Sequence, residues 1–180
     1  MDKIKSFKEY INLASNTLLE LPLEEHLLHM NLGFETEKGE FLDVFKKHLA
    51  YGKEIDWVNV GEELADYCWY IAGVFHAIGI KDEILDDLEE ELAKSKGRYD
   101  ESTDAKRSSP VIIAYNFAEK FKGDINDVIH ISVYCEYADL DFWQILTNNI
   151  EKLKIRFPEK FNQDKALNRD LDSERKKLEK

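Results

Sequence analysis

The sequence of residues 64–78 is LADYCWYIAGVFHAI, in which every residue is apolar, aromatic or glycine except Asp66 and His76. A helix that is apolar on almost all sides is a buried helix. An ionised carboxylate in such a helix is unfavourable unless it pairs with a positive group or coordinates a cation. The stretch therefore predicts a buried helix and a positive partner for Asp66.

The composition of the whole chain favours a single helical domain. Its 180 residues include 43% hydrophobic and 12% aromatic residues, which is enough for a packed core. The chain has only eight glycines and three prolines, and no segment sustains the apolar–polar alternation of a half-buried strand. The expected fold class is all-α, with one domain over residues 1–180.

Charge and hydropathy narrow the range of partners. A net charge of −12 disfavours nucleic acid, whose phosphates require a basic stripe on the protein. No uncharged apolar run has the length of a membrane span, and no signal pattern occurs near residue 1. Cys68 and Cys135 are too few and too scattered for a disulfide framework. We therefore expect a cytoplasmic protein that binds neither nucleic acid nor a membrane.

Cap residues predict the helices that precede the buried stretch. Asp56 is a suitable N-cap for a helix over residues 57–78. Pro22 fits the first turn of a preceding helix over residues 23–51, and Ser6 fits the N-cap of a first helix. The two longest of these helices are then joined by a short turn.

Two glycines fall inside the expected helix over residues 23–51. An interior glycine destabilises a helix by about 1 kcal/mol relative to alanine. Gly33 and Gly39 therefore indicate the close approach of a neighbouring element or of a ligand. The alternative is a helix that is broken near residues 31–33.

Two pairs of carboxylates have the spacing that places both side chains on one face of a helix. Glu37 and Glu40 form the first pair, and Glu63 and Asp66 form the second. Antiparallel helices joined by a short turn would bring the pairs face to face. Mg²⁺ prefers oxygen ligands in near-octahedral geometry and commonly keeps waters and substrate phosphates in its shell. The facing pairs would form an acidic floor for one or more such ions.

A di-iron carboxylate bundle is the main competing metal site. That site requires Glu-x-x-His on its helices, and no Glu in this chain is followed by His three residues later. The pattern therefore favours the magnesium site.

Several runs of sequence around these carboxylates resemble a known superfamily. The runs are LHMNLGFETEKGE at 28–40, FKKH at 45–48, YGK at 51–53 and EELAD at 62–66, followed by Trp69 and Tyr70. Together they resemble the MazG-like nucleoside triphosphate pyrophosphohydrolases, an all-α superfamily that includes dimeric dUTPases and phosphoribosyl-ATP pyrophosphohydrolase. The signature of that superfamily is Glu-x-x-Glu followed by Glu-x-x-Asp, which is matched by Glu37, Glu40, Glu63 and Asp66.

The resemblance implies an enzyme of nucleotide metabolism, a nucleotide pyrophosphohydrolase on a MazG-like helical bundle. Mg²⁺ would be its cofactor, with Mn²⁺ as an alternative ion. The enzyme would convert a nucleoside or deoxynucleoside triphosphate to the monophosphate and pyrophosphate, for control of the nucleotide pool. It would also form a homodimer. The residues that would bind the metal and serve catalysis are Glu37, Glu40, Glu63 and Asp66.

A second match implies the residues that bind the substrate. Asn149, Lys152 and Arg156 fit the Asn-x-x-Lys-x-x-x-Arg pattern of the superfamily, whose cations would meet the phosphate chain. Lys53 is a further candidate for the same role. His29 lies two turns before the first carboxylate pair, and it either contacts the nucleobase or forms a hydrogen bond within the core.

The chain departs from small members of the superfamily between the two matches. Residues 80–140 are expected to be an insertion or a degenerate repeat of the third and fourth helices. With an offset of 58 residues, Asp66 aligns with Asp124, but Phe121 takes the place of Glu63. A true duplication would make the chain a pseudo-dimeric monomer, and chance similarity between charged helices is the alternative.

Two further expectations concern the C-terminal end and the activity. Residues 161–180 are expected to form a charged tail. The alternative to an enzyme is a catalytically silent helical protein that binds a nucleotide or acts as a regulator, and that keeps the acidic cluster as a metal site. Pyrophosphate release that depends on a metal would distinguish the two.

Overall fold

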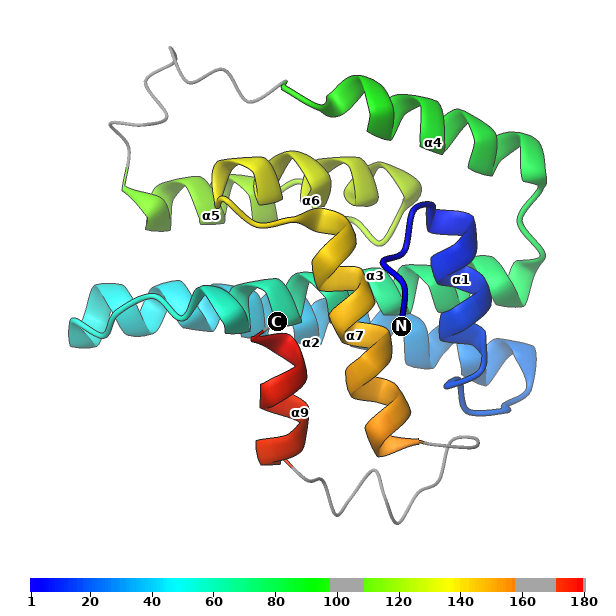
Figure 1. The fold of residues 1–180 in the computed structure, drawn as a ribbon, viewed down its shortest axis with the longest axis horizontal. Helices are drawn as coiled ribbons and strands as arrows, with labels where there is room; N and C mark the ends of the chain where they lie inside the picture. Colours follow the sequence, from blue (N-terminus) through cyan, green and yellow to red (C-terminus); the bar gives the residue numbers. More distant parts are fainter. Residues whose placement is uncertain (98–108, 158–170, 180) are drawn as a thin grey trace.

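The computed structural model describes residues 1–97, 109–157 and 171–179. Within these ranges the chain forms eight helices and no strand, so the predicted all-α class is confirmed (Figure 1). The helices are α1 (Phe7–Ser15), α2 (Leu23–Tyr51), α3 (Trp57–Ile78), α4 (Asp82–Ser95), α5 (Pro110–Ala118), α6 (Ile125–Tyr137), α7 (Phe142–Arg156) and α9 (Leu171–Leu178).

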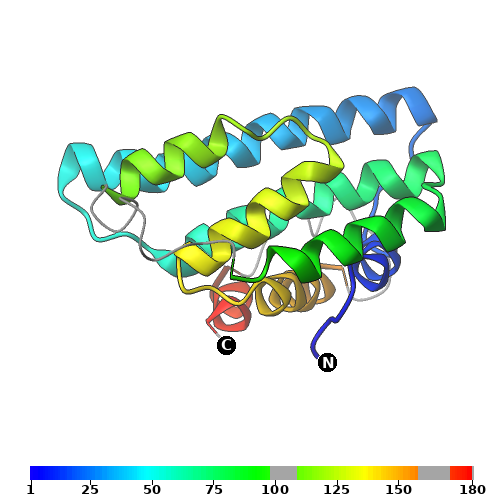
Figure 2. The ribbon, with the colours of Figure 1, turned by 90° about the horizontal axis from the view of Figure 1, so that it is seen from above.

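Helices α2 and α3 form a long antiparallel hairpin, which is the pair expected from the cap residues (Figure 2). Helix α2 ends at Gly52, whose φ of 65° is the left-handed conformation that glycine adopts without strain. The side chain of Asp56 then accepts a hydrogen bond from the backbone N–H of Asn59 and caps α3. The predicted N-cap of α1 is also confirmed, because Ser6 accepts from the N–H of Glu9.

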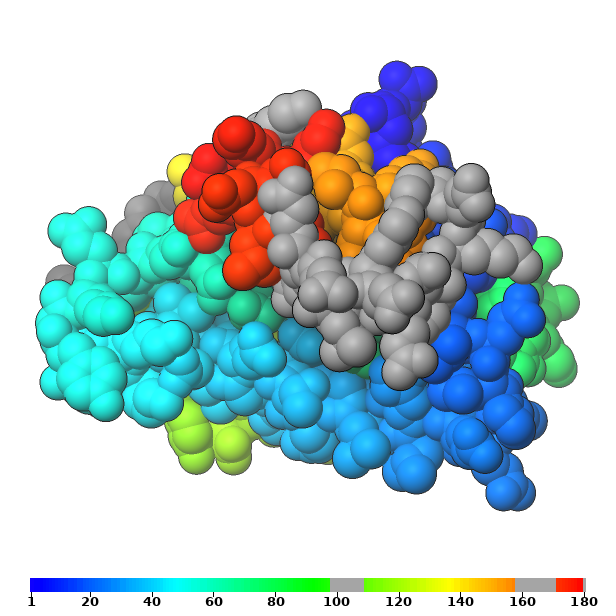
Figure 3. All heavy atoms as spheres, turned by 90° about the horizontal axis from the view of Figure 1, so that it is seen from below, coloured from blue at the N-terminus to red at the C-terminus, as the bar shows by residue number. Residues whose placement is uncertain are grey.

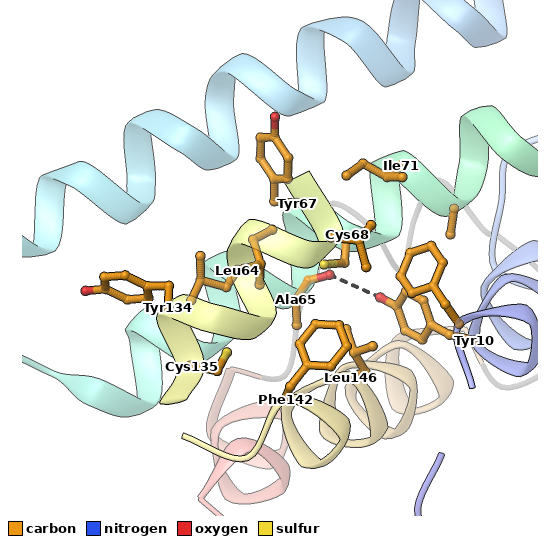
Figure 4. Close-up of a cluster of buried hydrophobic side chains, with 14 of the residues drawn as sticks. Tyr10, Leu64, Ala65, Tyr67, Cys68, Ile71, Tyr134, Cys135, Phe142 and Leu146 are labelled. Carbon is orange, nitrogen blue, oxygen red and sulfur yellow. Dashed lines mark hydrogen bonds between the residues drawn. The ribbon is translucent and has the colours of Figure 1, made fainter. Parts of the chain in front are cut away.

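Helix α3 lies at the centre of the molecule. Helices α1, α2, α6, α7 and α9 all pack against it, whereas α4 packs against α6 and α5 packs against α2. Its side chains Leu64, Cys68 and Ile71 are fully buried, and its Ala65 lies beside Tyr10 of α1 (Figure 4). The predicted buried helix is therefore confirmed, and its burial explains why the stretch is apolar on almost every side.

The two glycines of α2 have different surroundings. The helix runs without a break through Gly33, so the broken alternative is wrong. A Cβ atom added at Gly33 would lie 2.1 Å from the ring of Tyr70, whereas one added at Gly39 would meet nothing within 4 Å. The predicted close approach of a neighbour is thus found at Gly33 alone.

The segment between the two matched regions contains α4, α5 and α6. An offset of 58 residues sets α7 against α4, but it sets the continuous α3 against α5, a break and α6. Asp124 is the N-cap of α6, whereas Asp66, with which it aligns, is in the middle of a helix. Of the aligned ranges, residues 98–101 and 158–159 lie outside the described part of the chain. The duplication stays a prediction.

Two remaining features agree with the sequence. Cys68 and Cys135 are both buried and free. No helix among the described residues has the length and the apolar character needed to cross a membrane. Of the predicted C-terminal tail, the structure describes α9 and Glu179.

The contrast between the glycines predicts opposite effects of alanine. Gly39→Ala should raise the free energy of unfolding by about 0.5–1 kcal/mol, because the helix gains propensity and nothing is displaced. Gly33→Ala should lower it by about 1–2 kcal/mol, because the Tyr70 ring must move. Urea unfolding of both variants measures the difference. Equal effects at the two positions would contradict the packing described for α2 and α3.

Candidate metal centre

Three carboxylates from the α2–α3 hairpin converge on one point. Oxygen atoms of Glu37, on α2, and of Glu63 and Asp66, on α3, lie within 4.8 Å of one another. The hairpin therefore brings together three of the four carboxylates expected from the sequence. The fourth, Glu40, is exposed one turn further along α2; it borders the same cavity but does not join the group.

Burial and mutual repulsion disfavour the charged forms of the two glutamates in the cluster. Burial raises the pKa of Glu37 to about 9, with further contributions from the charges of Asp66, Glu63 and Glu40. Burial and the same neighbouring charge of Asp66 raise the pKa of Glu63 to about 8. The two glutamates also share a hydrogen bond. Near neutral pH and without a metal, these groups therefore hold protons that a cation would displace.

Asp66, which is half-buried, has the positive partner that its place in an apolar helix predicts. Lys152, on α7, is only 1% exposed, and its Nζ lies 2.5 Å from Asp66 Oδ2 and 3.1 Å from Glu62 Oε1. Burial alone would lower the pKa of Lys152, but Asp66 and Glu62 raise it above its ordinary value. The lysine is therefore charged and holds the two carboxylates together.

A hydrogen-bond chain fixes the second oxygen of Asp66. Asn149 Nδ2 donates to Asp66 Oδ1 over 2.5 Å. The hydroxyl of Tyr10 in turn donates to Asn149 Oδ1 at 2.9 Å, and it lies 3.1 Å from the carbonyl oxygen of Ala65 (Figure 4). Tyr10 was not expected in the site, because in sequence it is one aromatic residue on the apolar face of α1. On α3, Asn59 similarly donates to Glu63 Oε1 at 3.0 Å.

These contacts change the interpretation of two predicted substrate ligands. Asn149 and Lys152 do reach the site, but they lie behind Asp66 and do not border the cavity. Their polar groups are directed at carboxylates, so the expectation that Lys152 meets a phosphate directly does not fit this arrangement. The physical reason is the burial of the ammonium group, which requires anionic partners within the protein.

A cavity of about 230 Å³ opens beside the cluster. It is smaller than the roughly 300–1,000 Å³ of a typical small-molecule pocket, so it would enclose only part of a nucleotide. Five carboxylates border it, together with a single arginine and with polar, apolar and aromatic side chains. The residues bordering it are Thr17, His29, Glu37, Glu40, Glu62, Glu63, Asp66, Trp69, Tyr70, Leu153, Arg156 and Phe157.

His29, on α2, and Tyr70, on α3, both border the cavity, and their rings pack edge to face with centroids 5.9 Å apart. The Nδ1 atom of His29 is buried and has no hydrogen-bond partner among the described residues. Burial, together with the neighbouring His26, lowers the pKa of His29, so the ring is neutral. Burial and the charges of Glu37 and Asp66 raise the pKa of Tyr70 to about 12. Both side chains can therefore exchange hydrogen bonds with a ligand without carrying charge.

The remaining predicted cations differ in position. Arg156 borders the cavity, and its guanidinium forms two hydrogen bonds with Glu174. Lys53 is exposed in the turn after α2 and does not border the cavity. Between Glu40 and the end of α2 the helix rises by roughly 16 Å, which takes Lys53 away from the carboxylates.

The chemistry of the donors fits a hard divalent cation. All three converging groups are carboxylates, and oxygen ligands are those that Mg²⁺ and Mn²⁺ prefer. Among the residues that the structure describes, no His or Cys joins this group, so the nitrogen and sulfur ligands typical of zinc are missing from it. Each oxygen of Asp66 accepts one hydrogen bond from Lys152 or Asn149 and keeps a lone pair for a metal.

Comparison of the chain with protein-family models, with curated proteins and with solved structures finds no match in any of the three. The resemblance to the MazG-like superfamily therefore rests on the residues of this chain.

The raised pKa values predict how stability depends on pH. A carboxyl whose pKa is higher in the folded than in the unfolded state makes folding less favourable as pH rises between the two values. For Glu37 and Glu63 this window extends from about pH 4.5 to about pH 8–9. In EDTA, Glu37→Gln should therefore have a higher Tm than the wild type at pH 9, and a smaller advantage at pH 5. About 1 kcal/mol corresponds to roughly 2–4 °C for a chain of this length.

Thermal melts at both pH values test this expectation. Glu25→Gln is the matched control, because Glu25 is exposed in the first turn of the same helix. If the advantage of Glu37→Gln is the same at pH 5 and pH 9, the carboxylate is not a source of buried charge.

Proposed function

We propose that this protein is a Mg²⁺-dependent nucleoside triphosphate pyrophosphohydrolase of the MazG-like type. It converts a nucleoside or deoxynucleoside triphosphate to the monophosphate and pyrophosphate in the cytoplasm. The observation that carries the proposal is the convergence of Glu37, Glu63 and Asp66 from two antiparallel helices beside a cavity.

The charges around the cavity support a role for metal. Five carboxylates border it, and the ammonium of Lys152 is bonded to two of them, Glu62 and Asp66. Glu174, which pairs with Arg156, balances the charge of that arginine in the formal count, although the guanidinium still borders the cavity. A formal excess of four negative charges is left when all five acids are ionised, and it would repel a triphosphate. One divalent cation would halve that excess and two would cancel it, which would allow a triphosphate to approach.

The protein's own residues then position the reacting groups. A divalent cation held by Glu37, Glu63 and Asp66 would polarise a phosphoryl oxygen and lower the pKa of a bound water. Lys152 and Asn149 hold both oxygens of Asp66 in place. This metal-binding carboxylate therefore does not have to reorient during the reaction.

The rest of the cavity suits the phosphate chain and the nucleoside. Arg156 offers positive charge at the edge of the cavity, where negative charge develops on the phosphates. Trp69 and Tyr70 provide aromatic surface, and Trp69 is held in place because its Nε1 donates to Thr17 Oγ1 at 2.9 Å. Aromatic side chains of this kind can stack on a nucleobase or exclude water from the metal.

A homodimer is part of the proposal. Helix α2 exposes Leu28 and Leu32 on consecutive turns, with 59% and 60% of their surfaces open to solvent. A second copy would cover such side chains. A solution mass of one chain would instead favour the pseudo-dimeric monomer that follows from a true duplication.

The competing function is a catalytically silent protein that binds a nucleotide or regulates a partner. The observation in its favour is the ion pair of Asp66 with the buried Lys152, because such a pair also occurs as a static element of a core. In that case the acidic cluster binds an ion and performs no chemistry.

Pyrophosphate release from a panel of canonical and modified nucleoside triphosphates distinguishes the two functions. We expect turnover that requires Mg²⁺ and falls by about 10²-fold or more in Glu63→Gln, which keeps the shape of the side chain but removes a metal ligand. Glu25→Gln, on the exposed face of α2, should retain full activity. If no nucleotide is cleaved while circular dichroism shows an intact fold, the enzyme proposal is wrong and the silent protein is favoured.

A further inference from the structure

The C-terminal helix α9 is attached to the wall of the candidate site. It lies against α7, as the space-filling view in Figure 3 shows, and it also contacts α3. Its sequence LDSERKKL is mostly polar, so hydrophobic burial alone does not explain its position. Its polar contacts with the rest of the chain include Glu174 with Arg156, Arg175 with Asp56, Lys177 with Glu151, and the carbonyl oxygen of Leu178 with the Nδ2 of Asn148.

The contact between Glu174 and Arg156 is a largely buried, bidentate ion pair. Arg156 Nε donates to Glu174 Oε1 at 3.0 Å, and Nη2 donates to Oε2 at 2.6 Å. Glu174 is only 2% exposed, and the side chain of Arg156 is 16% exposed. Parallel hydrogen bonds of this kind fix the plane of the guanidinium. They also leave Nη1 without a partner among the described residues.

The position of Arg156 requires such an anchor. The five carboxylates that border the same cavity would attract an unanchored guanidinium toward the metal ligands, as Asp66 attracts Lys152. The charge of Arg156 is felt across the cavity, since it opposes the rise in the pKa of Tyr70. Glu174 holds that charge at the edge of the cavity and away from the acidic cluster.

We infer that Glu174 is a positioning residue, which orients Arg156 so that its remaining N–H groups bind a phosphate of the substrate. The C-terminal helix is then a part of the substrate site, although it borders no part of the cavity itself. The inference rests on the proposed function, because it assigns the anionic group bound by Arg156 to a triphosphate chain.

The test compares two ion pairs that hold the same helix. Glu174→Gln removes the charge that anchors Arg156. Arg175→Gln breaks a bidentate pair, in which Arg175 Nη1 and Nη2 donate to the oxygens of Asp56 at 3.0 and 2.9 Å, and neither of these residues borders the cavity. We expect Glu174→Gln to raise the KM for the nucleotide by about fivefold or more, and Arg175→Gln to leave it unchanged. Calorimetric affinity for Mg²⁺ should be the same in both.

A second readout does not depend on turnover. The affinity of the full chain for inorganic tripolyphosphate, measured by calorimetry in Mg²⁺, should fall by the same factor in Glu174→Gln and in Arg156→Gln. If Glu174→Gln does not fold, Glu174→Asp, which withdraws the carboxylate by one carbon, should weaken tripolyphosphate binding to an intermediate extent.

The outcomes separate this inference from the proposed function. Equal effects of Glu174→Gln and Arg175→Gln would mean that α9 acts only as a structural support, and the inference would be wrong. Tighter binding or faster turnover in Glu174→Gln would also overturn it, because Glu174 would then compete with the substrate for Arg156. A protein that binds tripolyphosphate in a Glu174-dependent manner but cleaves no nucleotide would contradict the proposed function and leave the role of Glu174 intact.

Discussion

The ion pair between Asp66 and Lys152 is the constraint on which the rest of the site depends. Asp66 lies on the central helix α3, where a carboxylate without a partner would be strongly destabilising. Lys152 satisfies it from α7 and is buried there, so loss of the lysine would leave both Asp66 and Glu62 without their cation. The pair therefore fixes α7 against α3 in one register. It also places Arg156, one turn further along α7, at the edge of the cavity.

The acidic cluster extends this arrangement across to α2. Lys152 compensates Asp66 and Glu62, but no cation among the described residues pairs with Glu37 or Glu63. The fold thus keeps two further acids at a place where burial disfavours their charged forms. Structures retain such unfavourable groups mainly where they serve a function, and a divalent cation is the partner that their oxygens suit.

Much of the fold could be predicted because it follows from local signals. The caps at Ser6 and Asp56 and the apolar sequence of α3 depend on neighbouring residues, and they placed the α2–α3 hairpin correctly. The helical spacing of the acidic residues likewise predicted that Glu37 would lie close to the carboxylates of α3, as it does. The partners of α7 could not be predicted in this way. A basic residue at helical spacing looks the same in sequence whether it faces a phosphate, as expected for Lys152, or a carboxylate, as found.

Binding of Mg²⁺ tests the central claim most directly. Calorimetric titration of the wild type at pH 7 should detect binding with release of protons, seen as a dependence of the heat on the buffer, because Glu37 and Glu63 must lose their protons to a metal. Glu37→Gln should weaken binding by about tenfold or more, whereas Asp87→Asn, on the exposed face of α4, should not. Absence of binding by the wild type, or equal affinity in Glu37→Gln, would contradict the metal centre and the function built on it.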